Sequence, residues 1–244
     1  FIRRLVAPVV DGEDFSTGYH KVVARDTGIV TMAYALCVQL MRYLQGISSF
    51  TQLWGGAMCF RLSAFRRYGV REFWMSNVVD DCSLADRLIH LGARIRLSGD
   101  AVLMTEAREH DLGVWHHWMD RQILFLKFCI PYQWVLLGVL ACLMLLPVLW
   151  AVLAVLGVLL GKLSFGWLVG VLVYAAALAL VLHSWAHFQE AVFPVWRWMV
   201  AFCASACMFV WVYLGTILAE GVLWQGIWYE VGRQGRVIRM RRQK

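Results

Sequence analysis

Residues 131–161 read PYQWVLLGVLACLMLLPVLWAVLAVLGVLLG and include no charged side chain. A helix needs about 20 consecutive apolar residues to cross the hydrocarbon core of a bilayer. Two further uncharged stretches follow at 165–187 and 198–219. As one helix the first stretch would be about 46 Å long, longer than the core, so we expect it to begin at the interface and to kink at Pro147. Together the stretches predict a helical membrane block over 131–222.

Charged residues are distributed unevenly on the two sides of this block. Of the 39 charged residues, 28 lie in residues 1–130 and only three in residues 131–219. We therefore expect three parts: a soluble-like domain at 1–130, the membrane block, and a basic tail at 223–244 that lies in the cytoplasm. The net charge of +7 gathers beside the membrane block and not on a soluble face, so nucleic acid is not an expected partner.

The number of membrane crossings must agree with the side of the membrane on which the basic residues lie. Basic residues favour the cytoplasmic side of a membrane, and they occur both in the tail and before the block, at Arg121 and Lys127. Two segments on one side must be separated by an even number of crossings. We therefore expect one of the three stretches, the third, to be re-entrant or interfacial. The seven Cys form no CxxC pair, which favours free thiols in a reducing compartment.

The first 130 residues alternate between two kinds of pattern. Apolar residues at helical spacing, with Gly46 and Gly92 as C-caps and Ser63 as an N-cap, predict helices, whereas short apolar runs predict strands. The expected helices are 29–44, 63–68, 81–91 and 115–128, and the expected strands are 58–60, 93–97 and 101–104. This alternation is typical of an α/β domain.

Two features of this zone point to chemistry. Gly55 and Gly56 follow Trp54 just before an expected strand, where paired glycines permit unusual backbone angles and close approach of a ligand; a plain turn is the alternative. Asp80 and Asp81 open an expected helix. Either one alone would be a helix cap. Repulsion between the two adjacent carboxylates also raises the pKa of one of them toward that of a useful base.

The order of motifs along the chain is similar to that of membrane glycosyltransferases of family 2 and, more closely, of family 21. These are ceramide glucosyltransferase-like enzymes that include bacterial hopanoid-associated members. The matching segments are FIRRLVAP (1–8), STGY (16–19), WGGAMCFR (54–61), VDDCSLA (79–85), LGARI (91–95), WMDRQ (118–122) and WQGIWY (224–229).

The resemblance implies the C-terminal part of a glycosyltransferase A fold followed by the membrane block. It implies inverting transfer from a nucleotide sugar, such as UDP-glucose or UDP-N-acetylglucosamine, to a lipid hydroxyl at the cytoplasmic face of a bacterial inner membrane. The acidic pair matches Asp80 and Asp81, and Asp81 takes the role of general base. Of the family's (Gln/Arg)-x-x-Arg-Trp motif only Arg121 is retained, since Trp118 and Gln122 depart from it. Arg121 is the candidate to stabilise the leaving diphosphate, and Trp54, Gly55, Gly56, Trp118 and Gln122 are the other candidate substrate-binding residues.

The same resemblance implies a divalent cation, Mg²⁺ or Mn²⁺, held by an Asp-x-Asp motif that would precede residue 1, so no metal ligand is expected within this chain. We expect the 244-residue chain to lack most of its donor site and not to transfer sugar by itself. Two alternatives are a processive polysaccharide synthase and a non-catalytic membrane scaffold. The first normally keeps an intact Gln-x-x-Arg-Trp, and a channel-type protein needs more ionisable residues within its apolar stretches.

Overall fold

A three-stranded mixed sheet forms the centre of the first 130 residues in the computed structural model, which describes residues 1–46, 53–190 and 193–242. Its central strand, β1 (Phe15–Ala24), pairs antiparallel with β2 (Met58–Phe60) and parallel with β3 (Ile95–Ala107). Gly18 is required in β1, because a Cβ there would lie within 2.4 Å of the carbonyl oxygen of Ala101. The register shifts between Thr17 and Tyr19 at this close approach.

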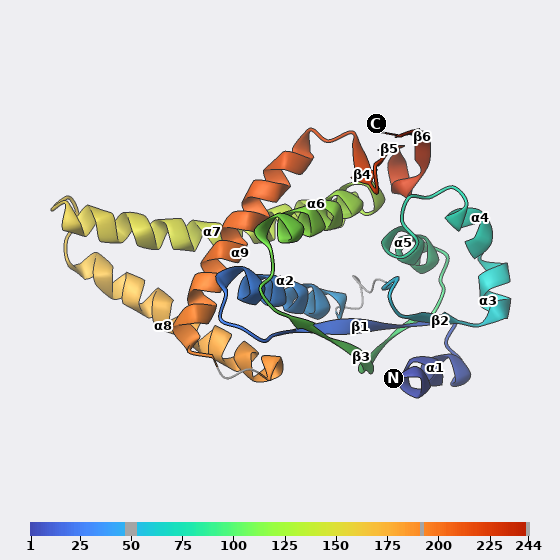
Figure 1. Ribbon diagram of the computed structural model, residues 1–244, viewed down its shortest axis with the longest axis horizontal. Coiled ribbons are helices and arrows are strands. Elements are labelled where there is room, and N and C mark those ends of the chain that lie inside the picture. The colour runs from blue at the N-terminus through green and yellow to red at the C-terminus, as the bar shows by residue number, and fades with distance from the viewer. Residues whose placement is uncertain (47–52, 191–192, 243–244) are drawn as a thin grey trace.

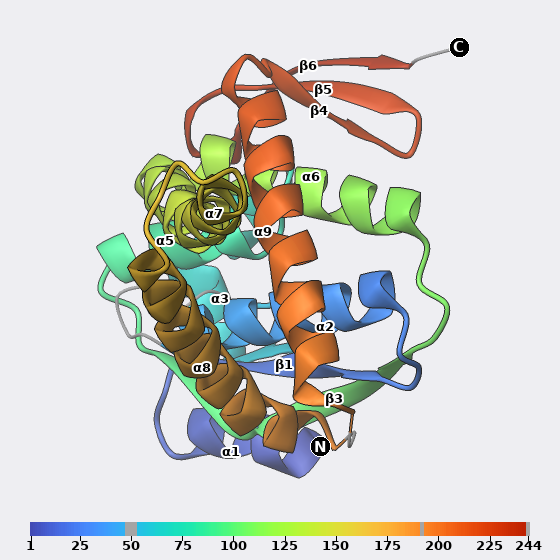
Figure 2. The same ribbon diagram turned by 90° about the vertical axis from the view of Figure 1, so that its left-hand side faces the viewer.

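Helices cover both faces of this sheet. Figures 1 and 2 show α1 (Ile2–Val10) on one face and α2 (Ile29–Gln45) on the other. The helices α3 (Leu62–Arg67), α4 (Val70–Trp74) and α5 (Cys82–His90) close one end around a buried apolar cluster that includes Phe15, Leu84 and Leu88.

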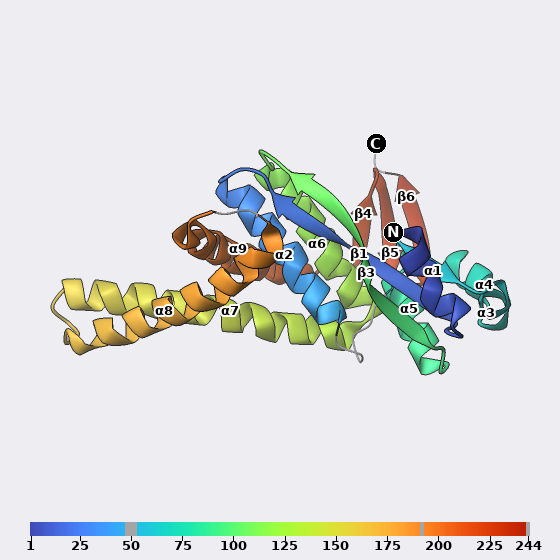
Figure 3. The ribbon, with the colours of Figure 1, turned by 90° about the horizontal axis from the view of Figure 1, so that it is seen from below.

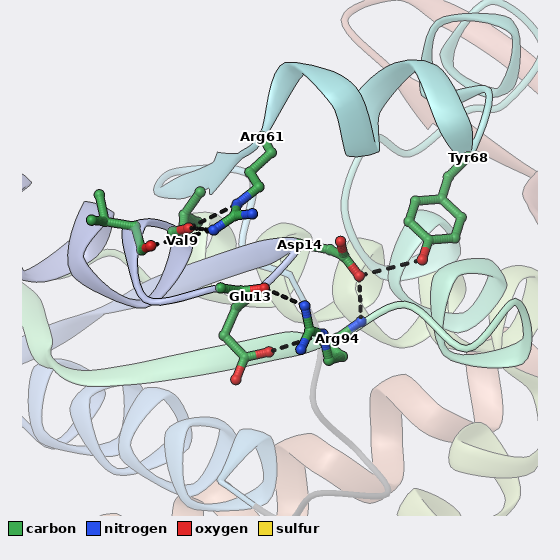
Figure 4. Close-up of polar contacts among 8 residues, drawn as sticks. Val9, Glu13, Asp14, Arg61, Tyr68 and Arg94 are labelled. Atoms are coloured by element: carbon green, nitrogen blue, oxygen red, sulfur yellow. Dashed lines mark hydrogen bonds and ion pairs between the residues drawn. The ribbon is translucent and has the colours of Figure 1, made fainter.

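Polar contacts join the first elements at the edge of the sheet (Figure 4). The Asp14 carboxylate accepts hydrogen bonds from the Tyr68 hydroxyl at 3.3 Å and from the Arg94 backbone N–H at 3.1 Å. The Arg61 guanidinium donates to the carbonyl of Val9 at 2.7 and 2.9 Å. These bonds anchor the end of α1 and the start of β1 to α3 and β3.

The apolar half of the chain contains three long helices, α7 (Pro131–Leu159), α8 (Gly166–Ala186) and α9 (Val195–Ile217). Each is long and apolar enough to cross a membrane by length and composition. The helix α6 (Leu112–Cys129) leads directly into α7, and a short 3-10 turn, η2 (His187–Gln189), follows α8. The mixed fold with three such helices confirms the predicted fold class.

The three helices are not equivalent. In Figures 1 and 3, α7 and α8 project together from the rest of the molecule as a hairpin, whereas α9 runs crosswise to them against α2 and α6. In its most apolar 18-residue window α9 is 39% buried, against 11% for α7 and 6% for α8. Beyond Ala141 the only buried residue of α7 is Ala154.

Both ends of α9 are tied to the first 130 residues. Near its start, Arg197 donates a hydrogen bond to the carbonyl of Thr27 at 3.1 Å. At its end, the ammonium of Lys127 on α6 donates to the carbonyls of Thr216, Ile217 and Ala219 at 2.6 to 2.9 Å. The carbonyls left free at the helix terminus thus find a cationic donor, and α9 is held to the first 130 residues at both of its ends.

The C-terminal segment forms a second, antiparallel sheet that the sequence patterns did not predict. Its strands are β4 (Gly221–Trp224), β5 (Ile227–Val231) and β6 (Val237–Arg242), with a short 3-10 turn, η3 (Arg233–Gly235), before the last of them. Lys244, part of the expected basic tail, lies outside the described residues.

Several local expectations are confirmed, and two are wrong. The strand 58–60 and the helices at 29–44, 81–91 and 115–128 appear where expected, with ends shifted by three residues or fewer. Ser63 does not cap a helix, because α3 already begins at Leu62 and its N-cap residue is Arg61, without a side-chain cap bond. The separate strands 93–97 and 101–104 are one strand, β3, because a single continuous partner, β1, pairs with both parts. Pro147 lies within α7, which is one helix from Pro131 to Leu159, so the kink expected there stays a prediction.

Candidate active site

The acidic pair lies at the start of α5. The Asp81 carboxylate accepts the backbone N–H of Cys82 at 2.5 Å, so it caps the helix. Its other oxygen accepts the N–H of Gly55 at 3.0 Å. Asp80 is exposed and is held through its backbone, since the Trp74 indole donates to the Asp80 carbonyl at 2.9 Å. Asp81 is therefore fixed in place, whereas the side chain of Asp80 faces solvent.

Gly55 and Gly56 allow neighbouring side chains to approach the backbone closely, and they do not adopt unusual backbone angles. Neither Gly55 nor Gly56 has a positive φ. A Cβ on Gly55 would lie 3.1 to 3.3 Å from the carboxylate oxygens of Asp80 and Asp81, and one on Gly56 would meet the Trp54 indole at 2.4 to 2.8 Å. The absence of side chains thus lets the acidic pair and the indole pack onto this loop. The loop is anchored to β1, because the Trp54 N–H donates to the Thr17 hydroxyl at 2.9 Å.

The surroundings of Asp81 shift its proton affinity. Burial raises the pKa of Asp81, the N–H groups of Gly55 and Cys82 partly counteract this, and the nearby Asp80 carboxylate raises the pKa further. A carboxylate with a raised pKa is a stronger base than an ordinary one while it is still ionised at neutral pH. The arrangement suits a general base.

A cavity of about 550 Å³ is lined by six of the eight candidate site residues, all except Gly55 and Gly56. Its polar wall includes Asp80, Asp81, Arg121 and Gln122, with the indoles of Trp54 and Trp118 beside them. Its apolar wall comes from α2, α6, α7 and the segment before β2. The apolar lining residues are Met41, Leu44, Leu53, Phe125, Leu126, Leu136, Leu137 and Leu140. Acidic, cationic and apolar side chains that lie far apart in the sequence thus face one cavity.

Arg121 is the cation of this cavity. It makes no hydrogen bond or ion pair within residues 1–46, 53–190 and 193–242. A guanidinium carries five N–H donors in a rigid fork that matches phosphate oxygens. An unpaired guanidinium in the same cavity as two carboxylates is suited to bind an anionic group of a ligand.

Among the other residues that line the cavity, and that the sequence patterns did not single out as site residues, are Tyr19 and His20 on β1 and Trp224 on β4. The His20 ring packs edge-on against Trp54, with ring centroids 5.0 Å apart. Burial lowers the pKa of His20, and burial together with Asp81 raises that of Tyr19. A signal was present, because STGY at 16–19 and WQGIWY at 224–229 both belong to the motifs that carry the family resemblance.

The described residues do not assemble a metal site. They contain no group of three or more His, Cys, Asp or Glu side chains placed to hold an ion. The Asp81 carboxylate already accepts two backbone N–H groups. The divalent cation stays a prediction from the family resemblance.

The pH dependence offers a direct test of the environment of Asp81. Because its pKa is raised and a general base acts in its ionised form, activity should be lost as the pH falls through this raised value. The acid limb of kcat/KM should thus lie above the range of an ordinary carboxyl, about 3.9. Asp80→Asn removes the neighbouring charge that raises the pKa of Asp81 and should move that limb to lower pH. Asp86→Asn, on the same helix, is the control and should leave the acid limb unchanged. An equally unchanged acid limb in Asp80→Asn would contradict the electrostatic effect of Asp80 on the pKa of Asp81.

The fold and this site together define a class of protein. A mixed α/β domain, an acidic pair and a free guanidinium in one cavity, and three apolar helices long enough to cross a membrane are the architecture of a membrane-associated glycosyltransferase. The model of glycosyl transferase family 21 matches residues 37–237 of the chain, so the chain belongs to that family. This confirms the resemblance to family 21 and supports a glycosyltransferase function. No curated protein and no solved structure matches the chain.

Proposed function

We propose that this protein transfers a sugar from a nucleotide diphosphate sugar to the hydroxyl of a membrane lipid, with inversion at the anomeric carbon. The observation that carries the proposal is the cavity, because its walls combine the acidic pair and Arg121 with apolar side chains of α7. That helix continues into the projecting hairpin. A lipid with its hydroxyl beside Asp81 and its hydrocarbon body along α7 would match both walls.

In the proposed reaction the acceptor hydroxyl is the nucleophile. Asp81 removes its proton as the oxygen attacks the anomeric carbon. A bond forms between that oxygen and the anomeric carbon, and the bond from the anomeric carbon to the nucleotide diphosphate breaks. The diphosphate leaves with the bonding electrons, and the Arg121 guanidinium stabilises its developing charge.

The structure supports a topology with two crossings. Residues 142–159 of α7 would be about 27 Å long at 1.5 Å per residue, close to the thickness of a hydrocarbon core. The hairpin of α7 and α8 leaves the catalytic half and returns to it, where Glu190 pairs with Lys21 at 2.8 Å. The crosswise α9 would then lie at the interface, with exposed Trp196 and Trp211 on its outer face. The catalytic half and the C-terminal sheet would share the cytoplasmic side, in a bacterial inner membrane if the hopanoid-type resemblance extends to the host.

Cysteine labelling tests this topology. In a background with the natural cysteines replaced by Ser, Ser164→Cys between α7 and α8 should react with a membrane-impermeant maleimide from outside the cell. Arg239→Cys on β6 should react only in inverted vesicles, as should the control Asp100→Cys on β3. Labelling of Arg239→Cys from outside would mean that α9 crosses the membrane, and would overturn the two-crossing topology.

The activity is tested with the complete gene product in nanodiscs. Radiolabelled UDP-glucose and UDP-N-acetylglucosamine are supplied with a lipid extract, and the products are separated by chromatography. The expected product is a lipid carrying one sugar with inverted anomeric configuration. A polymer would instead identify a processive synthase, and the absence of any transfer from either donor would contradict the proposal.

A further inference from the structure

The acidic pair is joined to the far end of the chain. Residues 76–78, which lead into Asp80 and Asp81, form three hydrogen bonds with residues 234–237. The Val78 N–H donates to the Gly235 carbonyl and the Val237 N–H to the Ser76 carbonyl, each at 2.9 Å. The Asn77 amide donates to the Gln234 carbonyl at 2.6 Å. We call residues 233–237 the C-terminal strap.

The backbone of the strap is shaped for this contact. Gln234 and Gly235 both have positive φ, 58° and 75°, which turns their carbonyls toward residues 77 and 78. Gly235 is buried, and a Cβ on it would lie 2.8 Å from the Cys129 sulfur and 3.4 Å from the Ser83 Cβ. Contacts below 3.0 Å force a displacement, so only glycine fits between the strap, α5 and α6.

The strap completes the support of the acidic segment. On one side of the pair, Ser83 donates to the Val79 carbonyl at 2.9 Å. Val78 and Val79 are buried in one apolar cluster with Val222 and Val231 of the C-terminal sheet. From the same sheet, Trp224 lines the cavity beside Asp81. The C-terminal sheet therefore contacts the site both through the backbone before the acidic pair and through the cavity wall.

We propose that the C-terminal strap holds Asp81 in its reactive position, and that Gly235 and Asn77 are positioning residues for the transfer step. The inference rests on the proposed function of Asp81 as general base. A displacement of about 1 Å at a reacting group costs up to about 100-fold in rate. Loss of the strap contact should therefore lower kcat while leaving the KM for the nucleotide sugar nearly unchanged.

Two glycines of the C-terminal sheet provide a matched comparison. Gly235 and Gly226 have nearly the same φ, 75° and 74°, so alanine introduces similar backbone strain at both. A Cβ on Gly226 meets nothing within 4 Å, whereas one on Gly235 meets Cys129. The difference between Gly235→Ala and Gly226→Ala isolates the docking of the strap from the strain within the sheet.

The experiment measures hydrogen exchange and kinetics on the complete gene product in nanodiscs. In Gly235→Ala, backbone exchange of residues 76–81 should rise about tenfold and kcat should fall at least about tenfold, with KM within twofold. Gly226→Ala should leave both within twofold of the natural protein. Asn77→Ala removes one hydrogen bond of the strap without inserting an atom. It should also raise the exchange of residues 76–81 and lower kcat, and it replaces Gly235→Ala in the test if that variant does not fold.

The outcomes of the exchange and kinetic measurements test the strap contact, the positioning role and the proposed function separately. Equal exchange of residues 76–81 in the two glycine variants would show that the strap does not hold this segment. Raised exchange with unchanged kcat would overturn the positioning role. If the natural protein transfers no sugar, the proposed function fails, while the exchange comparison still decides whether the strap holds the acidic segment.

Discussion

Asp81→Asn is expected to lower the rate of sugar transfer by about 10²- to 10⁴-fold, the usual contribution of a general base. Asparagine cannot take a proton from the acceptor hydroxyl. The Gly55 and Cys82 N–H groups donate to different oxygens of the carboxylate, so the one amide oxygen of asparagine keeps one of these two bonds. Asparagine caps helices about as well as aspartate. The substitution therefore removes the base and one of the two hydrogen bonds to the carboxylate, while the helix keeps a capping side chain. The measurement is the initial rate of labelled lipid formation in nanodiscs.

The control for this variant is Asp111→Asn. Asp111 caps α6 and accepts the Val114 N–H at 2.9 Å, but it does not line the cavity. It should keep nearly full activity, and both variants should insert into the membrane and unfold at similar temperatures. A rate within threefold of the natural protein for Asp81→Asn would remove Asp81 from the role of base.

Arg121→Ala should have the second largest effect, a loss of about 10²- to 10³-fold in kcat, as seen when one donor to a developing negative charge is removed. The guanidinium faces the cavity without a protein partner among the described residues, so its removal leaves no carboxylate unpaired and should cost little stability. Arg121→Lys keeps the charge without the planar fork and should recover part of the lost rate. The measurement is kcat and KM for the nucleotide sugar.

Arg108→Ala is the matched control for Arg121→Ala. Arg108 is an exposed residue outside the cavity, and its guanidinium lies 3.9 Å from the Glu106 carboxylate. An exposed pair of this kind contributes little, so both rate and stability should stay close to those of the natural protein. Equal losses in Arg121→Ala and Arg108→Ala would indicate a general effect of charge and not stabilisation of the leaving group.

Local patterns predicted α2, α3, α5 and α6 but missed α1, α4 and the central strand β1. The helix α5 was predictable because Leu84 and Leu88 recur at helical spacing, with Asp81 before it and Gly92, at a φ of 73°, after it. Strand β1 lacks alternation, since it is buried on both faces at its two ends, and its middle carries His20 and Lys21. A strand whose identity depends on partners about 40 and 80 residues away leaves no periodic signal in the sequence.

The C-terminal sheet was missed for a related reason. The basic residues of 223–244 suggested a tail at the membrane surface, but Val222 and Val231 are buried against residues before Asp81. The turn at Gln225 and Gly226, both at positive φ, begins the hairpin. Its docking depends on Gly235 fitting against Cys129, a contact between residues about 100 positions apart that no local pattern encodes.

The sequence by itself determined the three apolar helices long enough to cross a membrane, the α/β character of the first 130 residues and the family, because each depends on composition, short-range periodicity or the order of motifs along the chain. Only the tertiary structure decided that α9 lies crosswise to α7 and α8, that the Gly55 N–H bonds Asp81, and that Asp81 and Arg121 line one cavity beside α7. The physical reason is that burial and hydrogen bonding between distant segments settle these arrangements. A helix apolar enough to face lipid is equally able to pack against α2 and α6.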